Sequence, residues 1–390
     1  MPTAPFAGYE TSERESIRCD GLNMEEKTAM ERLAVHLQEK KVYDIVAGDS
    51  FDSLADEVKA LGTEKKKLCI VTDSHVAEYY LEEVKHLLSE ICQQVDTFIF
   101  PAGEEYKNLN TVRDLYKVLI QKAYDRKDML VALGGGVTGD LCGFAAATYL
   151  RGIAFIQIPT TLLAQVDSSI GGKTGVDFDA YKNMVGAFHM PSLVYTNVST
   201  LFTLPEVQFI SGMGEVVKHG LIKSASYYHW LTKHHNEIMS RDVKVCQTMI
   251  LESNRIKRDV VEQDPMEKGE RALLNFGHTL GHAIEKLKEF SMPHGHCVAV
   301  GFLAAAKMSA ARGYLTGEDI ALLEKMMCSI KLPTTVSGLD EDAVMEAVKR
   351  DKKMEAGQIK FILLRALGRA EIFCDVSQKE MRQGLAGIMN

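Results

Sequence analysis

Several features that would place this chain in other classes of protein are missing from its sequence. The eight cysteines form no CxxC pair and show no regular spacing, which argues against a disulfide framework and favours a reducing compartment. The first residues, MPTAPFAGYETSERES, lack the apolar segment of a secretory signal, so we expect a cytoplasmic protein. No apolar run approaches the ~20 residues that a membrane span needs, so we expect no membrane partner.

Excess positive charge is absent as well, and so are internal repeats and low-complexity segments. A net charge of −8 argues against a general nucleic-acid partner, although a locally basic pocket could still bind a small anion. Apolar residues make up 46% and charged residues 25% of the chain, as in an ordinary globular protein. A chain of 390 residues is longer than one core usually serves, so we expect two domains.

The order of expected elements divides the chain into three parts. Residues 1–30 are polar and weakly periodic, and we interpret them as an N-terminal extension. From Val42 strands alternate with helices, which predicts a mostly parallel sheet with helices on both faces. We therefore expect an α/β fold in which residues 31–204 form a Rossmann-like nucleotide-binding domain. After Leu204 most segments carry helical periodicity, so residues 205–390 are expected to form a mostly α-helical metal- and substrate-binding domain, with a possible hairpin at 358–373.

A glycine-rich turn follows the expected strand DMLVALGGG. Gly134, Gly136 and Gly139 satisfy GxGxxG between a strand and a helix, a context in which the backbone can approach a pyrophosphate at a helix N-terminus. The acid expected about 20 residues later to bind the ribose is missing, and the candidates are instead Asp73 and Glu104. The sequence thus predicts a dinucleotide site that departs from the standard pattern.

A packing turn between strand and helix would explain one or two of these glycines. It would not explain their combination with the Thr160–Thr161 pair and the Gly171–Gly172–Lys173 cluster. Such a density of small, hydroxylated and basic residues beside apolar strands favours an enzyme that acts on a phosphorylated small molecule.

A second informative segment is RALLNFGHTLGHAIE. Arg271, Asn275, His278, His282 and Glu285 are spaced so that one continuous α-helix would place them on one face. A helix that only packs would carry apolar residues in this stripe. Two histidines four residues apart, with Arg and Asn, favour a metal or catalytic site.

Further candidate ligands lie on either side of this segment. Glu215 precedes it in GMGEVVKHG, and His294 follows it in SMPHGHCVAVG. One carboxylate and two histidines with an open position are typical of a catalytic zinc centre, but spacing does not choose among His278, His282, His294 and His296. Basic residues that could attract a phosphate and a carboxylate are Lys218, Lys257 and Arg271.

Together these motifs resemble the 3-dehydroquinate synthase family of sugar-phosphate cyclases. The resemblance runs from about Tyr43 to the C-terminus and is dense at GGGVTGD, PTTLLAQVDSSIGGKTGV, GMGEVVKHG and RALLNFGHTLGHAIE. It implies conversion of 3-deoxy-D-arabino-heptulosonate 7-phosphate to 3-dehydroquinate and phosphate in the shikimate pathway. The implied steps are transient oxidation by NAD, phosphate elimination, re-reduction and intramolecular aldol closure.

The resemblance also implies roles for individual residues. It implies that Glu215, His278 and His294 bind the metal, Zn²⁺ or Co²⁺, and that His282 transfers protons. The residues implied for NAD are Asp73, Glu104, Lys107, Gly135, Gly136, Val137, Asp140, Thr160, Thr161, Lys173, Lys182, Thr200 and Thr203. Those implied for the substrate and its chemistry are Asp167, Lys173, Asn183, Lys218, Lys257, Glu267, Arg271, Asn275 and one of Lys352 and Lys353. Arg151 is implied to reach the substrate of a neighbouring subunit, which predicts a homodimer.

The chain departs from the family at one point near the metal. The family usually has HGE at the third metal-binding segment, whereas this chain reads HGH, with His296 in place of the acid. A carboxylate commonly orients a ligating histidine. Its loss would either alter metal affinity or be offset by another acid.

Other functions share parts of this pattern. The nearest is another sugar-phosphate cyclase, of the inosose, valiolone or aminodehydroquinate type, but Arg271, Asn275 and the DKK lysines favour a carboxylated substrate. A metal-dependent polyol dehydrogenase would accumulate NADH. A non-catalytic NAD- or metal-binding regulator would leave the polar helix stripe unexplained.

Overall fold

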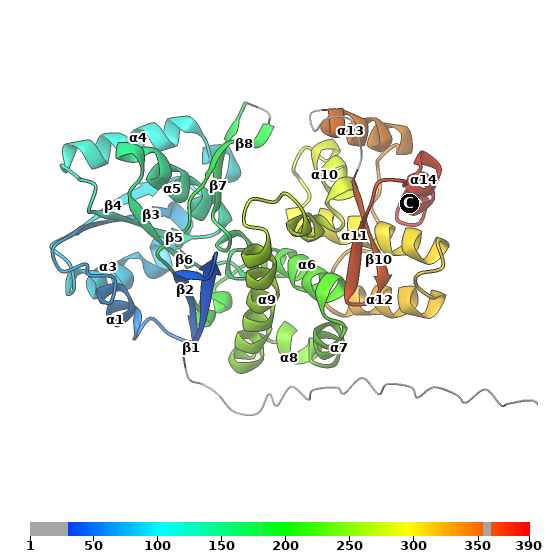
Figure 1. Ribbon diagram of the computed structural model, residues 1–390, viewed down its shortest axis with the longest axis horizontal. Coiled ribbons are helices and arrows are strands. Elements are labelled where there is room, and N and C mark those ends of the chain that lie inside the picture. Colours follow the sequence, from blue (N-terminus) through cyan, green and yellow to red (C-terminus); the bar gives the residue numbers. More distant parts are fainter. Residues whose placement is uncertain (1–29, 180, 354–359) are drawn as a thin grey trace, which may run out of the picture.

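An α/β half built on one sheet lies beside a half made mostly of helices in the computed structural model (Figure 1). The model describes residues 30–179, 181–353 and 360–390, without the side chains of 351–353. This arrangement confirms the expected fold class. The expected extension lies outside the described residues apart from residue 30, and the domain boundary after residue 204 stays a prediction.

The main sheet has seven strands in the order β1-β2-β9-β6-β5-β3-β4. All neighbours are parallel except β1, which is antiparallel to β2, so the prediction of a mostly parallel sheet is confirmed. The strands are β1 Glu31–Leu37, β2 Lys40–Gly48, β3 Lys67–Asp73, β4 Gln94–Phe100, β5 Met129–Gly134, β6 Ala154–Pro159 and β9 Leu193–Asn197. The sequence pattern did not predict β1 or β9.

Helices cover both faces of this sheet, as expected. Because side chains alternate along a strand, Cys69 and Val71 of β3 pack on one face while Leu68 and Ile70 pack on the other. The first face carries α4 Leu109–Gln121 and α5 Gly136–Thr148, and the second carries α1 Leu54–Lys59 and α3 Glu82–Ser89. The short helix α2 Ser74–Val76 and a π-helical turn, Ala77–Leu81, lead into α3.

The second half has its own, larger hydrophobic core. Its centre is α11, most of whose residues are buried and which packs against α6 and α10. The helices are α6 Glu206–Lys223, α7 Ala225–Lys233, α8 His235–Met239, α9 Val243–Gln263, α10 His278–Leu287, α11 His294–Ala311, α12 Gly317–Ser329, α13 Glu341–Lys353 and α14 Gln378–Ala386.

Two hairpins complete the fold. β10 Phe361–Ala366 pairs with β11 Arg369–Phe373, so the hairpin expected near the C-terminus is confirmed. β7 Lys173–Phe178 pairs with β8 Tyr181–Phe188, within the glycine- and lysine-rich segment, and this hairpin was not predicted.

The single helix expected over residues 271–285 is wrong. Glu270–Asn275 form a 3₁₀ helix, and α10 begins only at His278. Between them Gly277 adopts φ +82°, a left-handed conformation that breaks an α-helix and that glycine tolerates best. Arg271 and Asn275 therefore do not continue the face that carries the histidines.

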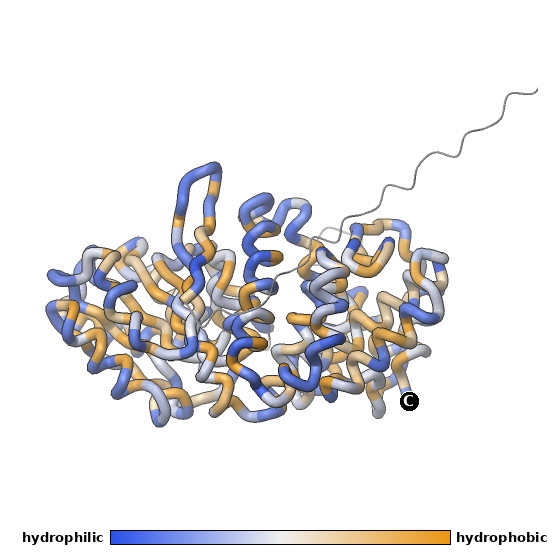
Figure 2. The backbone as a smooth tube through the Cα atoms, turned by 90° about the horizontal axis from the view of Figure 1, so that it is seen from below, coloured by the Kyte–Doolittle hydropathy of each residue, from blue (hydrophilic) through white to orange (hydrophobic). Residues whose placement is uncertain are grey.

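Hydrophobic and hydrophilic segments alternate along the chain in both halves (Figure 2). Among the described residues no helix is both long and apolar enough to cross a membrane. The described cysteines are all free thiols.

Candidate active site

The carboxyl ends of four neighbouring strands bring most of the predicted cofactor residues to one edge of the sheet. In the order β9-β6-β5-β3 these strands end at Asn197, Pro159, Gly134 and Asp73. Ligands of open α/β sheets bind beside such ends. The predicted residues that lie at these ends or shortly after them are Asp73, Gly135, Gly136, Val137, Thr160, Thr161, Thr200 and Thr203.

The glycines of the turn before α5 serve two purposes, close packing and exposure of backbone N–H groups to a ligand. A Cβ on Gly134 would come within 2.4 Å of Thr138, so packing requires this glycine, and one on Gly139 would come within 2.5 Å of the side-chain oxygen of Gln157, which would have to move. Gly135 is the N-cap of α5 and provides no side-chain cap. The first turn of α5 therefore keeps backbone N–H groups of the kind that bind phosphate.

Besides its predicted role in cofactor binding, Asp73 makes hydrogen bonds that hold the local structure together. Its Oδ1 accepts hydrogen bonds from the backbone N–H groups of His75 and Val76, at 3.0 and 3.1 Å, and so caps α2. The hydroxyl of Thr138 donates to its Oδ2 at 3.3 Å. These bonds fix the carboxylate beside the glycine turn.

Lys107 joins two of the predicted cofactor acids. Its Nζ lies 2.9 Å from Asp140 Oδ2 and 3.4 Å from Glu104 Oε1. Burial alone would lower the pKa of Lys107, but the charges of Asp140 and Glu104 outweigh burial and raise it. Burial raises the pKa of Asp140 despite Lys107. The three groups form one compact charged cluster next to α5.

Glu215 and two histidines face one another in the helical half. Glu215 is fully buried in α6, and its Oε1 lies 3.7 Å from His278 Nε2 and 3.8 Å from His294 Nε2. Within the described part of the chain nothing donates a hydrogen bond to this oxygen, while Lys218 pairs with Oε2. A buried carboxylate oxygen facing two imidazole nitrogens fits a divalent cation with an open position.

The structure also brings His282 into this group. One ligand atom each from His278, His282 and His294 lies within 4.8 Å of the others, so the choice of Glu215 over His282 as third ligand stays a prediction. His282 is exposed, whereas Glu215 is buried. Burial holds the pKa of His278 well below its ordinary value, which keeps this ring neutral and able to bind a metal.

The acid partner of His294 comes from α10. Glu285 Oε2 lies 3.1 Å from His294 Nδ1, and Lys182 donates to Glu285 Oε1 at 2.8 Å. Burial would lower the pKa of His294, but the bond to Glu285 raises it. Burial would raise the pKa of Glu285, yet His294 and Lys182 lower it to about 2. The structure thus places an acid beside His294 although the HGH segment lacks one, and the Nε2 of His296 is buried without a hydrogen-bond partner among the described residues.

A second charged group lies between the two halves. Lys257 of α9 contacts both the side chain and the backbone oxygen of Asp167. Burial lowers the pKa of Lys257 to about 8, although Asp167 opposes the shift. The charges of Lys257 and Lys218 outweigh burial and hold the pKa of Asp167 well below its usual range.

Three other predicted substrate residues meet next to the β7–β8 hairpin. Lys173 at the start of β7 pairs with Glu267, whose Oε1 accepts a hydrogen bond from Asn275 Nδ2 at 2.9 Å. Nearby, Arg271 is buried and donates to the backbone oxygen of Gly171 at 3.0 Å. A Cβ on Gly171 would lie 2.5 Å from this guanidinium, so the second glycine cluster makes room for Arg271.

The remaining predicted residues lie apart from these contacts. Arg151 is exposed in the 3₁₀ turn Tyr149–Arg151 that follows α5, and α5 itself extends about 20 Å from Gly136 at 1.5 Å per helical residue. Asn183 is exposed on β8. The side chains of Lys352 and Lys353 lie outside the described residues.

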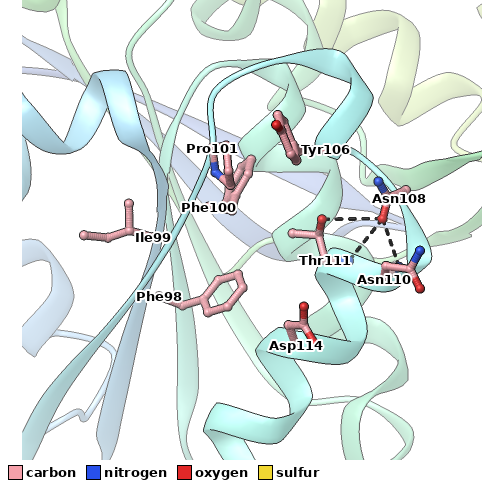
Figure 3. A pocket seen from close by; sticks show the side chains of 9 residues that line it. All are labelled: Phe98, Ile99, Phe100, Pro101, Tyr106, Asn108, Asn110, Thr111 and Asp114. Carbon is pink, nitrogen blue, oxygen red and sulfur yellow. Dashed lines mark hydrogen bonds between the residues drawn. The ribbon is translucent and has the colours of Figure 1, made fainter.

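A separate pocket opens at the edge of the sheet, between β4 and α4 (Figure 3). Its volume is about 440 Å³ and its titratable lining groups are Tyr106 and Asp114. It contains none of the predicted site residues, and we assign it no catalytic role. It is lined by Phe98, Ile99, Phe100, Pro101, Tyr106, Asn108, Asn110, Thr111 and Asp114.

Sequence reasoning missed two members of the site. Glu285 was noted in the polar stripe but was given no role, although its spacing of seven residues from His278 was the available signal. His219 is fully buried, and its Nε2 lies 4.0 Å from Asp167 Oδ1. Burial lowers its pKa to about 3, so it is a neutral neighbour of the charged group. No spacing in the sequence indicates this contact.

Comparisons with known proteins identify the family to which this chain belongs. The family model "3-dehydroquinate synthase N-terminal" matches residues 97–211, and the model "3-dehydroquinate synthase C-terminal" matches residues 212–354. A protein named 3-dehydroquinate synthase from Acetivibrio thermocellus is 42% identical over 352 residues, which cover 90% of this chain and 97% of the relative.

Two solved cyclase structures share the fold. The 2-epi-5-epi-valiolone synthase of Streptomyces hygroscopicus subsp. jinggangensis, with NAD⁺ and Zn²⁺ bound, has a TM-score of 0.82 and 26% identity, and the match covers 91% of this chain and 98% of that one. A 2-deoxy-scyllo-inosose synthase complexed with carbaglucose-6-phosphate, NAD⁺ and Co²⁺ also has a TM-score of 0.82 and 26% identity, with coverage of 92% and 100%. Identity to the relative from Acetivibrio thermocellus is thus higher than to either of these cyclases.

Proposed function

The chain belongs to the 3-dehydroquinate synthase family, and on this premise we propose that it converts 3-deoxy-D-arabino-heptulosonate 7-phosphate to 3-dehydroquinate and phosphate. One observation carries the proposal. A buried Glu215 oxygen without a hydrogen-bond donor among the described residues faces two histidines, in a chain whose glycine turn and basic residues suit a nucleotide and an anionic substrate.

Glu215, His278 and His294 would hold the divalent cation, Zn²⁺ or Co²⁺. The donor set of one carboxylate and two imidazoles suits either ion. A divalent cation bound there would lower the pKa of a substrate hydroxyl and favour its oxidation.

NAD would bind along the carboxyl edge of the sheet. The open first turn of α5 suits the pyrophosphate, and Asp73 lies on the neighbouring strand β3. Bound NAD would accept a hydride from the substrate and return it later, so that no net oxidation occurs. The residues proposed to hold it are Asp73, Glu104, Lys107, Gly135, Gly136, Val137, Asp140, Thr160, Thr161, Lys173, Lys182, Thr200 and Thr203.

The basic residues would bind the substrate's phosphate and carboxylate. Lys218 and Lys257 are buried, so their charges act in a medium that screens them little. The Nε of Arg271 is buried without a hydrogen-bond partner among the described residues, which leaves a donor for an anionic group. Fixing both ends of the substrate supplies the positioning on which elimination and ring closure depend.

His282 would move protons beside the metal ligands. Its ring centroid lies 5.0 Å from that of His278 and 5.8 Å from that of His294. Imidazole suits proton transfer near neutral pH. The substrate-positioning residues around it would be Asp167, Lys173, Asn183, Glu267 and Asn275.

We also propose a homodimer in which Arg151 completes the site of the neighbouring subunit. Its exposure in the turn beyond the end of α5 that lies away from the glycine turn supports this role, because a neighbouring subunit could reach it there. The division into residues 31–204 and 205–390, and a cytoplasmic location, belong to the same proposal.

The direct test supplies the protein with NAD, Zn²⁺ and the heptulosonate phosphate. We expect inorganic phosphate and 3-dehydroquinate to appear in equal amounts while absorbance from NADH does not accumulate. An uncarboxylated sugar phosphate, run in parallel, is expected to release no phosphate. Stoichiometric NADH would indicate a dehydrogenase instead, and turnover of the uncarboxylated substrate alone would indicate another cyclase.

A further inference from the structure

The two carboxylate oxygens of Glu285 contact different halves of the molecule. It is buried in α10 with 5% of its surface exposed. Oε2 lies 3.1 Å from the Nδ1 of His294, and Oε1 accepts a hydrogen bond from Lys182 Nζ at 2.8 Å. Lys182 belongs to the β7–β8 hairpin, whereas Glu285 and His294 belong to the helical half.

The bond to Glu285 determines which nitrogen of His294 is available. When Nδ1 donates its hydrogen to a carboxylate, the lone pair remains on Nε2. This Nε2 is the nitrogen that lies 3.8 Å from Glu215 Oε1. Glu285 thus directs the coordinating atom of His294 towards Glu215.

The same helix carries a metal ligand and the acid that orients the other ligand. His278 is the first residue of α10, and Glu285 lies near its end. Any change in the position of α10 therefore moves both together. His294 begins the next helix, α11, which packs against α10.

The hairpin makes further contacts with the end of α10 and with the residues just after it. Lys182 Nζ lies 4.4 Å from the centre of the Phe290 ring, and Lys286 Nζ lies 5.6 Å from that of Tyr181. These cation–π contacts flank the Lys182–Glu285 ion pair. The ion pair is therefore part of a small interface between the hairpin and α10.

We propose that Glu285 is a positioning residue that orients His294 for the metal and, through Lys182, couples metal binding to NAD binding. This inference rests on the proposed function, because it takes the metal from Glu215, His278 and His294 and the NAD contact from Lys182. It adds a residue that has no assigned role in that function. It also explains how the chain orients His294 although His296 replaces the acid of HGE.

The first test measures metal affinity on the full chain, without NAD or substrate, by competition with a chromophoric chelator for Zn²⁺. We expect Glu285→Ala to bind Zn²⁺ about 10- to 100-fold more weakly, the usual effect of removing such a partner. Glu285→Gln is expected to lose less, because its amide oxygen can still accept the bond from Nδ1. Glu289→Gln, which changes an exposed acid just beyond α10, is the matched control and is expected to bind as the unchanged protein does.

A spectroscopic measurement separates orientation from folding. With Co²⁺ in place of Zn²⁺, the visible absorption bands of Glu285→Gln are expected to shift while its circular dichroism spectrum is unchanged. If both Glu285 variants keep the affinity and the Co²⁺ spectrum of the unchanged protein, the inference is wrong. If the unchanged protein itself binds no metal, the proposed function fails instead.

The coupling is tested by measuring NAD affinity with and without Zn²⁺. Coupling between two binding sites is reciprocal and commonly amounts to about fivefold or more, so we expect metal to tighten NAD binding by at least that factor. Lys182→Met should weaken NAD binding in both states and abolish the difference between them. A difference of the same size in Lys182→Met would overturn the coupling.

Discussion

At the scale of single residues, the two histidines of α10 are proposed to have separate roles although they lie one turn apart. His278 Nε2 faces Glu215, whereas His282 is exposed beside the same group. Because the spacing of the two residues fits either role, their substitution distinguishes a ligand from a proton carrier.

We expect His278→Ala to lose both the metal and the activity while keeping its fold. His282→Ala should keep the metal, and its kcat should fall about 10²- to 10⁴-fold, the usual contribution of a general acid or base. Metal content by atomic absorption and steady-state turnover measure the two effects. Equal metal loss in both variants would show that His282 is a ligand.

The second residue-scale prediction concerns Lys257, whose pKa is lowered by burial to about 8. As pH rises through this value the amine loses its charge, and an anionic substrate loses an attractive partner. We therefore expect kcat/KM to fall above about pH 8, by about tenfold per pH unit if only the charged form is active.

Lys257→Arg is the control for this pH dependence. Its guanidinium stays charged throughout the range, so the variant should be less active at pH 7 but should lack the decline above pH 8. If the decline persists unchanged in Lys257→Arg, another group is responsible for it.

At the scale of elements, the start of α10 positions His278, the first of the proposed metal ligands. The break at Gly277 turns the chain so that His278 opens a new helix facing Glu215. A Cβ at residue 277 would lie 2.6 Å from the backbone nitrogen of Phe302 in α11. Gly277 is thus needed both for the break before α10 and for the close packing of α10 on α11.

We expect Gly277→Ala to lower the free energy of unfolding by about 2–5 kcal/mol, from backbone strain and overpacking together. Gly313→Ala is the matched control, because Gly313 has φ +77° with nothing within 4 Å of the added Cβ, and it should cost about 1 kcal/mol. Denaturant unfolding followed by circular dichroism measures both. Equal losses would mean that packing at residue 277 contributes nothing.

At the scale of the whole molecule, contacts between the two halves assemble the site. Asp167 contacts Lys257, Lys173 pairs with Glu267, and Lys182 pairs with Glu285. In each pair one residue comes from the α/β half and the other from the helical half. The site therefore depends on how the two halves sit against each other.

The proposed role of Arg151 would extend this dependence to a second copy of the chain. If it serves the partner's site, a dimer of one Arg151→Ala chain and one His278→Ala chain has one intact site. Random exchange between the two variants in a C2 dimer makes about half of all dimers mixed, so the mixture should recover about a quarter of full activity. Activity after co-refolding of the two inactive proteins measures this, and no recovery would place Arg151 in its own subunit's site.

Local patterns in the sequence predicted the alternating strands and helices, the glycine turn at the end of β5 and the hairpin β10–β11. These features depend on side-chain periodicity and on glycine at turns, which neighbouring residues reveal. The strand β1 was missed because the alternating pattern was recognised only from Val42, although its partner β2 follows directly in the chain. The strand β9 was missed because it has five residues and pairs with β2 and β6, which are remote from it in the sequence. The expected helix over 271–285 was wrong because the periodicity of polar residues does not reveal that one glycine, Gly277, has a positive φ.

By itself, the sequence determined the fold class, the family and the types of residue that could bind a metal, a nucleotide and an anion. Only the tertiary structure decided that Glu215 faces His278 and His294, that Gly171 makes room for Arg271, and that Glu285 lies beside His294. The reason is physical: ligand and hydrogen-bond geometry is set by distances of a few ångströms between helices and strands that are remote in the chain. Packing fixes those distances, whereas residue spacing along the sequence does not.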